Sequence, residues 1–316
     1  MRSIASTADT SDYFDSRFVS VDRMRLHYVE HGVGAPVVWL HGNGSMVSDF
    51  LSSKVVARLV GRHRVVAFDR PGFGYSDRPR GQTWGPFEQA RLFLRAFELL
   101  GIERPILVGH SWGALVALAA AMEAGRELAG LVLLSGYYYP EPWRDETRRN
   151  PLAGLANPLV DEIIRETVGP YVSRLMAPGA VRKVFAPCPV PERFMDSYSM
   201  PHAVRPSQMR AAIEEADMLM ESARRLSELY GELDLPVRLV AGSADRIVPT
   251  HKHSARLHGD IARSRFLNVE GVGHMIHHSA PEQVVAAIEA VAEAVPSPPR
   301  VCRHWLHIDH AVAAAG

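Results

Sequence analysis

The stretch "PILVGHSWGALVALAAAM", residues 105–122, decides the fold. An apolar, β-prone run leads into the pentapeptide GHSWG, residues 109–113, and a long apolar run of helix-forming residues follows. This pattern predicts a buried strand that turns directly into a buried helix. The serine between two glycines has two interpretations. Either a tight turn happens to contain it, or the turn presents Ser111 as a nucleophile.

Strands and helices alternate on both sides of this turn. Residues 18–32 predict two antiparallel strands at an edge of a sheet. Further strands are predicted at residues 36–42, 63–69, 128–136, 236–245 and 264–274, and helices at 86–101 and 281–295. The alternation predicts an α/β protein with a mostly parallel, doubly wound sheet of about eight strands. Its ligand site is expected beyond the carboxyl ends of the strands.

The alternation is interrupted between residues 137 and 232. This segment holds eleven of the 22 prolines and six of the eleven methionines. We interpret it as a helical cap inserted after the sixth strand, with residues 1–136 and 233–295 as the core and 296–316 as a tail. The helix most strongly predicted in the cap starts at residue 206. Its apolar stripe runs through Met209, Ile213, Ala216, Met220, Ala223 and Leu226.

Composition limits the functional classes. The chain has 316 residues, is 47% hydrophobic and 22% charged, and carries no formal net charge. We therefore expect a globular protein with a small-molecule substrate, and no nucleic-acid or membrane partner. Two cysteines, Cys188 and Cys302, and the lack of a signal-like or spanning apolar segment favour a cytoplasmic location. The oligomeric state stays open.

Downstream residues complete the serine chemistry. A serine hydroxyl needs a base to take its proton and an acid to orient that base. His274 in "VEGVGHMIHH" and Asp245 in "VAGSADRIVP" follow late strands, in the order Ser, Asp, His that this topology requires. The loop "LHGNG", residues 40–44, predicts an oxyanion hole made by the backbone N–H groups of Asn43 and Trp112.

Several other residues compete for these roles or flank them. Glu141 is an alternative acid, and His277 and His278 are alternatives to His274. Trp112 and Met275 adjoin catalytic positions and are expected to contact substrate, with core packing as the alternative for both. His41, Asp69 and Arg70 are interpreted as scaffold. No cofactor or metal is expected, and the remaining grouped histidines are interpreted as solvated: His251, His253, His258, His304, His307 and His310.

Residues 18–295 resemble the α/β-hydrolase superfamily with a cap. The segments "HGNG", "DRPGFGYSDRP", "GHSWG", "GSADRIVP" and "GVGH" carry the resemblance. "GHSWG" and "DRPGFGYSD" are similar to the epoxide-hydrolase and dehalogenase branch, whose members carry an aspartate nucleophile where this chain has Ser111. A carboxylate displaces at saturated carbon, whereas a serine suits acyl transfer at a carbonyl. The resemblance and Ser111 together imply a serine esterase.

Three alternatives remain open. A C–C bond hydrolase would use a cap arginine for a substrate carboxylate, with Arg174, Arg182 and Arg193 as candidates. A proline iminopeptidase-like amidase would use cap acids for a substrate amine, with Glu214 and Glu215 as candidates. A non-catalytic small-molecule-binding homologue is the third alternative, and an intact Ser-His-Asp set speaks against it.

Overall fold

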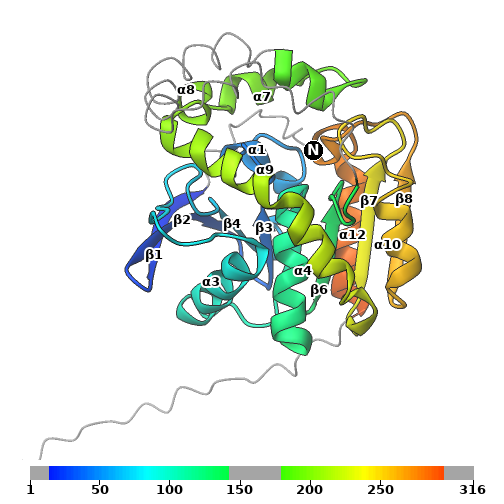
Figure 1. Ribbon diagram of the computed structural model, residues 1–316, viewed down its shortest axis with the longest axis horizontal. Coiled ribbons are helices and arrows are strands. Elements are labelled where there is room, and N and C mark those ends of the chain that lie inside the picture. Colours follow the sequence, from blue (N-terminus) through cyan, green and yellow to red (C-terminus); the bar gives the residue numbers. More distant parts are fainter. Residues whose placement is uncertain (1–13, 142–178, 295–316) are drawn as a thin grey trace, which may run out of the picture.

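The computed structural model describes residues 14–141 and 179–294, which form a layered α/β structure around one eight-stranded sheet (Figure 1). The strand order is β1-β2-β4-β3-β5-β6-β7-β8. β1 pairs antiparallel with β2, and β2 with β4, while all other pairs are parallel. The strands are β1 Asp15–Val21, β2 Met24–His31, β3 Ala35–Leu40, β4 His63–Phe68, β5 Ile106–His110, β6 Gly130–Leu134, β7 Val237–Gly242 and β8 Ser264–Val269. The predicted fold class is confirmed.

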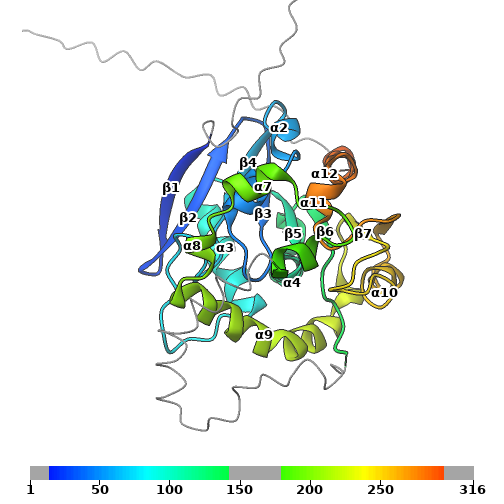
Figure 2. The ribbon, with the colours of Figure 1, turned by 90° about the horizontal axis from the view of Figure 1, so that it is seen from above.

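Helices cover both faces of the sheet, as the view from above shows (Figure 2). One apolar layer is formed with α3 (Pro86–Leu99), α4 (Trp112–Ala124) and α10 (Ser254–Asp260). The opposite layer is formed with α1 (Val47–Leu51), α2 (Val56–Leu59), α11 (Ile276–Ser279) and α12 (Pro281–Ala294). Two 3-10 turns, η2 (Gly125–Glu127) and η3 (Tyr230–Glu232), join elements of the core. No helix within the described ranges has both the length and the apolar character needed to cross a bilayer.

The helix α4 is apolar around its whole circumference because it is enclosed on all sides. Residues 112–121 are all buried. The sheet covers one side of α4, and the helices α3 and α9 (Pro206–Ser227) contact it on others. A helix in such surroundings needs no polar stripe. This packing places the first turn of α4, and with it the GHSWG pentapeptide, at a rigid point of the molecule.

Three helices of the segment interpreted as a cap lie over the carboxyl ends of the central strands: α7 (Glu192–Ser197), α8 (Met200–Ala203) and α9 (Figure 1). The part of that segment from 142 to 178 lies outside the described residues. The side chains of Phe194, Tyr198 and Met200 face the same cavity as the loops that follow the strands. These helices therefore form the roof of the cavity at the carboxyl ends of the strands.

The apolar stripe predicted for α9 is partly wrong. Ile213 and Ala216 are exposed, whereas Gln208 and Glu215 are buried on the face that contacts the core. Glu215 binds Arg70, and Gln208 accepts the backbone N–H of Gly74 through Oε1 at 3.0 Å. The buried face of α9 thus carries polar residues with partners in the core, which a search for apolar periodicity does not detect.

Candidate active site

Ser111 stands at the turn between β5 and α4 in a left-handed backbone conformation, with φ 53° and ψ −115°. This conformation is strained for a residue with a side chain and is typical of functional turns. A Cβ atom at Gly109 would collide with the carbonyl oxygen of Gly113, and one at Gly113 would collide with that of Leu40. The two glycines are therefore required by close backbone approach, and the turn they allow presents Ser111 to a cavity.

Asp245 and His274 form a direct pair, although they follow different strands. Asp245 Oδ2 lies 2.8 Å from Nδ1 of His274, and both side chains are buried. The other oxygen, Oδ1, accepts the backbone N–H groups of Ile247 and Val248 at 2.8 and 2.9 Å. These bonds hold the carboxylate in one orientation. A neutral His274 that donates from Nδ1 to Asp245 has Nε2 as its acceptor atom.

The loop after β3 is held by His41 and Arg70. His41 Nδ1 donates to the Gly42 carbonyl at 2.8 Å, and Nε2 accepts the backbone N–H of Arg70 at 2.9 Å. Burial and the nearby charge of Arg70 lower the pKa of His41 to about 3, so the ring stays neutral. The Arg70 guanidinium also donates to the carbonyls of His41 and Gly42. His41 and Arg70 are scaffold, as the sequence predicted.

Asp69 has a similar structural role. Its carboxylate accepts the backbone N–H of Val47 at 2.8 Å and of Tyr75 at 2.9 Å, and lies 2.6 Å from Nδ1 of His27. A Cβ at Gly74, where φ is +52°, would overlap this carboxylate. Asp69 therefore ties the loops after β3 and β4 together, beside the site and outside its chemistry.

The two backbone N–H groups predicted to form the oxyanion hole are those of Asn43 and Trp112. Asn43 uses its side-chain amide to donate to the carbonyl of Ala212 in α9 at 2.9 Å. The Asn43 backbone N–H makes no hydrogen bond to another described residue. Trp112 is the first residue of α4, so its N–H has no acceptor within the helix. Positive potential at a helix N-terminus adds to this donor.

Ser111 and His274 line one cavity of about 380 Å3 beneath α7 and α8. The side chains that the roof contributes to it are mainly apolar: Ala180, Val181, Val184, Phe194, Met200, Ala203 and Val204. Met275 also lines the cavity and packs with Phe185 and Phe194, and its contact with substrate stays a prediction.

The side-chain role expected for Trp112 needs correction. Its indole lies in the apolar core, and Trp112 is not among the residues that line the cavity. The physical reason is the enclosure of α4 by α3 and α9, which draws the first-turn side chain into the core. Only the backbone N–H of Trp112 remains a candidate for contact with a substrate.

The competing residues have other partners. Glu141 binds Lys252, with Oε2 and Nζ 2.6 Å apart. His277 and His278 both contact Asp49. His253 is buried, which corrects its interpretation as a solvated residue, because its Nδ1 accepts the backbone N–H groups of the Tyr138 and Tyr139 segment. His251 and His258 are exposed, and the tail histidines lie outside the described residues.

Sequence reasoning missed two residues that shape the site, Asp49 and Tyr198, and it missed the partner of a third, Glu215, which it offered only for binding a substrate amine. Asp49 lines the cavity and binds two histidines, Glu215 binds Arg70 from the roof, and Tyr198 donates its hydroxyl to the Gly44 carbonyl at 2.8 Å. An acid on the buried face of a helix was the one available signal, for Glu215. Asp49 and Tyr198 stand in segments without a motif, so no comparable signal existed for them.

Comparison with known proteins supports the fold. A model of the alpha/beta hydrolase fold family matches residues 35–281. The chain is 28% identical over 298 residues to haloalkane dehalogenase 2 of Mycobacterium tuberculosis (strain ATCC 25618 / H37Rv), which covers 90% of this chain and 98% of the relative. It is 26% identical over 285 residues to the uncharacterized hydrolase YugF of Bacillus subtilis (strain 168), with 85% and 94% covered.

Solved structures show the same fold at lower identity. Esterase RhEst1 from Rhodococcus sp. ECU1013 superposes with a TM-score of 0.69 at 22% identity, covering 90% of this chain and 99% of the other. An esterase from Thermogutta terrifontis superposes with a TM-score of 0.69 at 23% identity, covering 90% and 100%. The chain belongs to the alpha/beta hydrolase fold family, and this membership supports a hydrolase.

Proposed function

We propose that this protein is a serine hydrolase that cleaves a carboxylic ester of a small, largely apolar substrate. The observation that carries the proposal is the Asp245–His274 pair on the wall of the cavity to which the strained turn presents Ser111. A nucleophile, a base and an orienting acid on separate loops of one rigid sheet are the set that acyl transfer requires.

The mechanism follows from the roles of these atoms. His274 Nε2 takes the proton of Ser111 as its Oγ attacks the ester carbonyl, and Asp245 stabilises the imidazolium that forms. The N–H groups of Asn43 and Trp112 stabilise the oxyanion. The tetrahedral intermediate expels the alcohol, which takes the proton from His274 and leaves an acyl-enzyme. Water, deprotonated by His274, then releases the acid and restores Ser111.

Ser111 separates this proposal from displacement chemistry. The relative named haloalkane dehalogenase 2 belongs to enzymes that use an aspartate nucleophile, which attacks a saturated carbon. A serine hydroxyl with a histidine base is suited to a carbonyl carbon, where the developing oxyanion can be stabilised. The sequence similarity therefore supports a shared fold and hydrolytic machinery, and the side chain at position 111 favours a different bond.

The cavity favours an uncharged substrate. Glu214 and Glu215, the candidates for binding a substrate amine, are paired with Arg78 and Arg70. Arg182 is exposed, and neither Arg182 nor Arg193 is among the residues that line the cavity. Arg174 lies outside the described residues. An apolar acyl or alcohol group matches the apolar side chains of the roof better than a charged group does.

The experiment compares wild type and Ser111→Ala on p-nitrophenyl esters of increasing acyl length. We expect wild type to hydrolyse them, with a preference for one chain length set by the cavity. Ser111→Ala should lose at least about 1,000-fold in kcat because attack on the carbonyl needs the hydroxyl. A fluorophosphonate should label wild type at Ser111 and leave the variant unlabelled.

Two outcomes would contradict the proposal. Ester hydrolysis at the wild-type rate by Ser111→Ala would place the nucleophile elsewhere. Failure of the folded wild type both to react with the fluorophosphonate and to hydrolyse any of the esters would favour a binding protein. Ser135→Ala is the matched control, since Ser135 is also a serine at a strand end with positive φ but does not line the cavity.

A further inference from the structure

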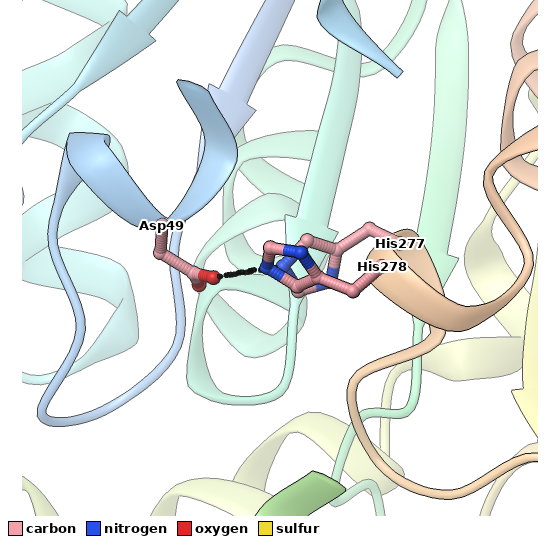
Figure 3. Close-up of side chains that lie close together, drawn as sticks. All are labelled: Asp49, His277 and His278. Atoms are coloured by element: carbon pink, nitrogen blue, oxygen red, sulfur yellow. Dashed lines mark hydrogen bonds and ion pairs between the residues drawn. The ribbon is translucent and has the colours of Figure 1, made fainter. Parts of the chain in front are cut away.

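Asp49, which lines the same cavity, belongs to a second group of titratable side chains. Asp49 of α1 faces His277 and His278 of α11, and Figure 3 shows both imidazoles directed at its carboxylate. Asp49 Oδ1 lies 3.1 Å from Nε2 of His277 and 2.8 Å from Nε2 of His278. All three side chains are buried. Two histidines adjacent in sequence thus converge on one oxygen atom from a distant part of the chain.

We propose that Asp49, His277 and His278 form a binding site for one divalent transition-metal ion, with Zn²⁺ as the best fit. The three candidate ligand atoms all lie within 4.8 Å of one another. Ligands about 2.0–2.2 Å from a tetrahedral Zn²⁺ ion lie about 3.3 Å apart, close to the two separations in the cluster. Two imidazole nitrogens and one carboxylate oxygen form a donor set that Zn²⁺ accepts readily.

The charge of the cluster favours a cation. The Asp49 side chain is 1% exposed, so its carboxylate is removed from solvent. Its hydrogen-bond partners are the Ser45 hydroxyl, at 2.8 Å from Oδ2, and the two imidazoles, none of which is a permanent cation. A divalent ion would supply an opposite charge to this carboxylate in its ionised form.

Proton placement is compatible with metal binding. Coordination through Nε2 requires each ring to carry its remaining proton on Nδ1. Nδ1 of His277 has no hydrogen-bond partner within the described part of the chain. No group on that side therefore holds His277 in the opposite tautomer, and the ring can exchange its Nε2–H···O bond to Asp49 for a metal bond.

The surroundings provide access and orientation. Ser45 and Asp49 line the 380 Å3 cavity, so an ion can reach the carboxylate from it and keep open positions for water or a ligand. The ring of Trp39 contacts His277 at a centroid distance of 5.4 Å, and Phe194 contacts His278 at 5.3 Å. Such aromatic packing holds ligand rings in place and limits solvent near a metal.

The proposal is tested by metal binding itself, independently of catalysis. Full-length protein is stripped with a chelator, and Zn²⁺ affinity is measured by competition with a chromophoric chelator. Wild type should bind one equivalent. Asp49→Asn and His278→Gln should each weaken binding by at least about tenfold, because each removes one of three ligands. Co²⁺ added to wild type should give the intense visible absorption of a four- or five-coordinate site.

The controls separate this site from adventitious binding. His251→Gln removes an exposed histidine, and a variant with His304, His307 and His310 all changed to Gln removes the tail histidines. Both should keep the high-affinity equivalent. Circular dichroism checks that each variant folds, and the Co²⁺ spectrum of wild type remains a test if Asp49→Asn does not. Absence of stoichiometric binding to wild type, or loss of that equivalent only in the tail variant, would overturn the proposal.

Discussion

Asp245 illustrates how a single residue can serve both structure and chemistry. One oxygen is bound by two backbone N–H groups and the other by His274, so each acceptor has a separate task. Asp245→Asn should fold but lower kcat for ester hydrolysis by about 10,000-fold, because an amide can donate to Nδ1 and stabilise the wrong tautomer of His274. Steady-state kinetics on the best p-nitrophenyl ester measure this loss.

Glu141→Gln is the matched control for that prediction. Glu141 is the other acid that the sequence offers, and it binds Lys252 at the edge of the site. We expect its kcat to stay within a few-fold of wild type. The opposite result, a large loss in Glu141→Gln and a small one in Asp245→Asn, would assign the orienting acid to the loop after β6.

At the scale of elements, a buried ion pair joins α9 to the loop after β4. Arg70 and Glu215 form a two-pronged contact, and both side chains are fully buried. Gln89 of α3 donates to the same carboxylate at 2.9 Å. Glu215→Gln should lower the free energy of unfolding by about 3 kcal/mol, because the guanidinium of Arg70 would remain buried without a counter-charge. Urea denaturation measures the change.

Two further variants show whether the pair or the packing carries this effect. Glu221→Gln removes an exposed acid of the same helix, whose partner Arg224 is also exposed, and should change the free energy of unfolding much less than Glu215→Gln does. Replacing Arg70 and Glu215 together by Met should destabilise less than the sum of the single changes, since no unpaired charge is left. Additive single and double changes would argue against a coupled ion pair.

At the scale of the whole molecule, buried neutral histidines link stability to pH. Burial, with the Arg70 charge, lowers the pKa of His41 to about 3, and burial lowers that of His253 to about 4. An unfolded histidine has a pKa of about 6.5. Below pH 6.5 the unfolded chain therefore binds protons that the folded chain does not bind. The free energy of unfolding has its full value above pH 6.5 and falls as the pH drops below it. His41 alone should cost about 2 kcal/mol by pH 5.

Urea denaturation between pH 7.5 and pH 5 tests this dependence. His253→Gln keeps an acceptor for the backbone N–H groups of Tyr138 and Tyr139 but cannot take a proton. As the pH drops, its free energy of unfolding should fall less steeply than that of wild type. The difference in slope should be about 1.4 kcal/mol per pH unit, which corresponds to one proton. His251→Gln, an exposed change, should follow wild type. Identical slopes in all three proteins would contradict the prediction.

The fold was predicted from local patterns in the sequence. Apolar runs and amphipathic segments located the strands and α3 and α12, because periodicity reports which face of an element is buried. The edge hairpin, β1 and β2, also followed from its alternation. The same signal was misleading for α9, whose buried face carries Gln208 and Glu215 with partners in the core. Those partners lie far away in the sequence, so periodicity cannot detect them.

The sequence by itself determined the sheet, the glycine-flanked turn at Ser111 and the order of Ser111, Asp245 and His274, because strand–helix alternation and turn chemistry are local properties. Only the tertiary structure decided which acid meets His274, where the Trp112 indole lies, and that Asp49 faces His277 and His278. The physical reason is that a buried polar group must find a partner, and folding brings together partners that sequence distance separates.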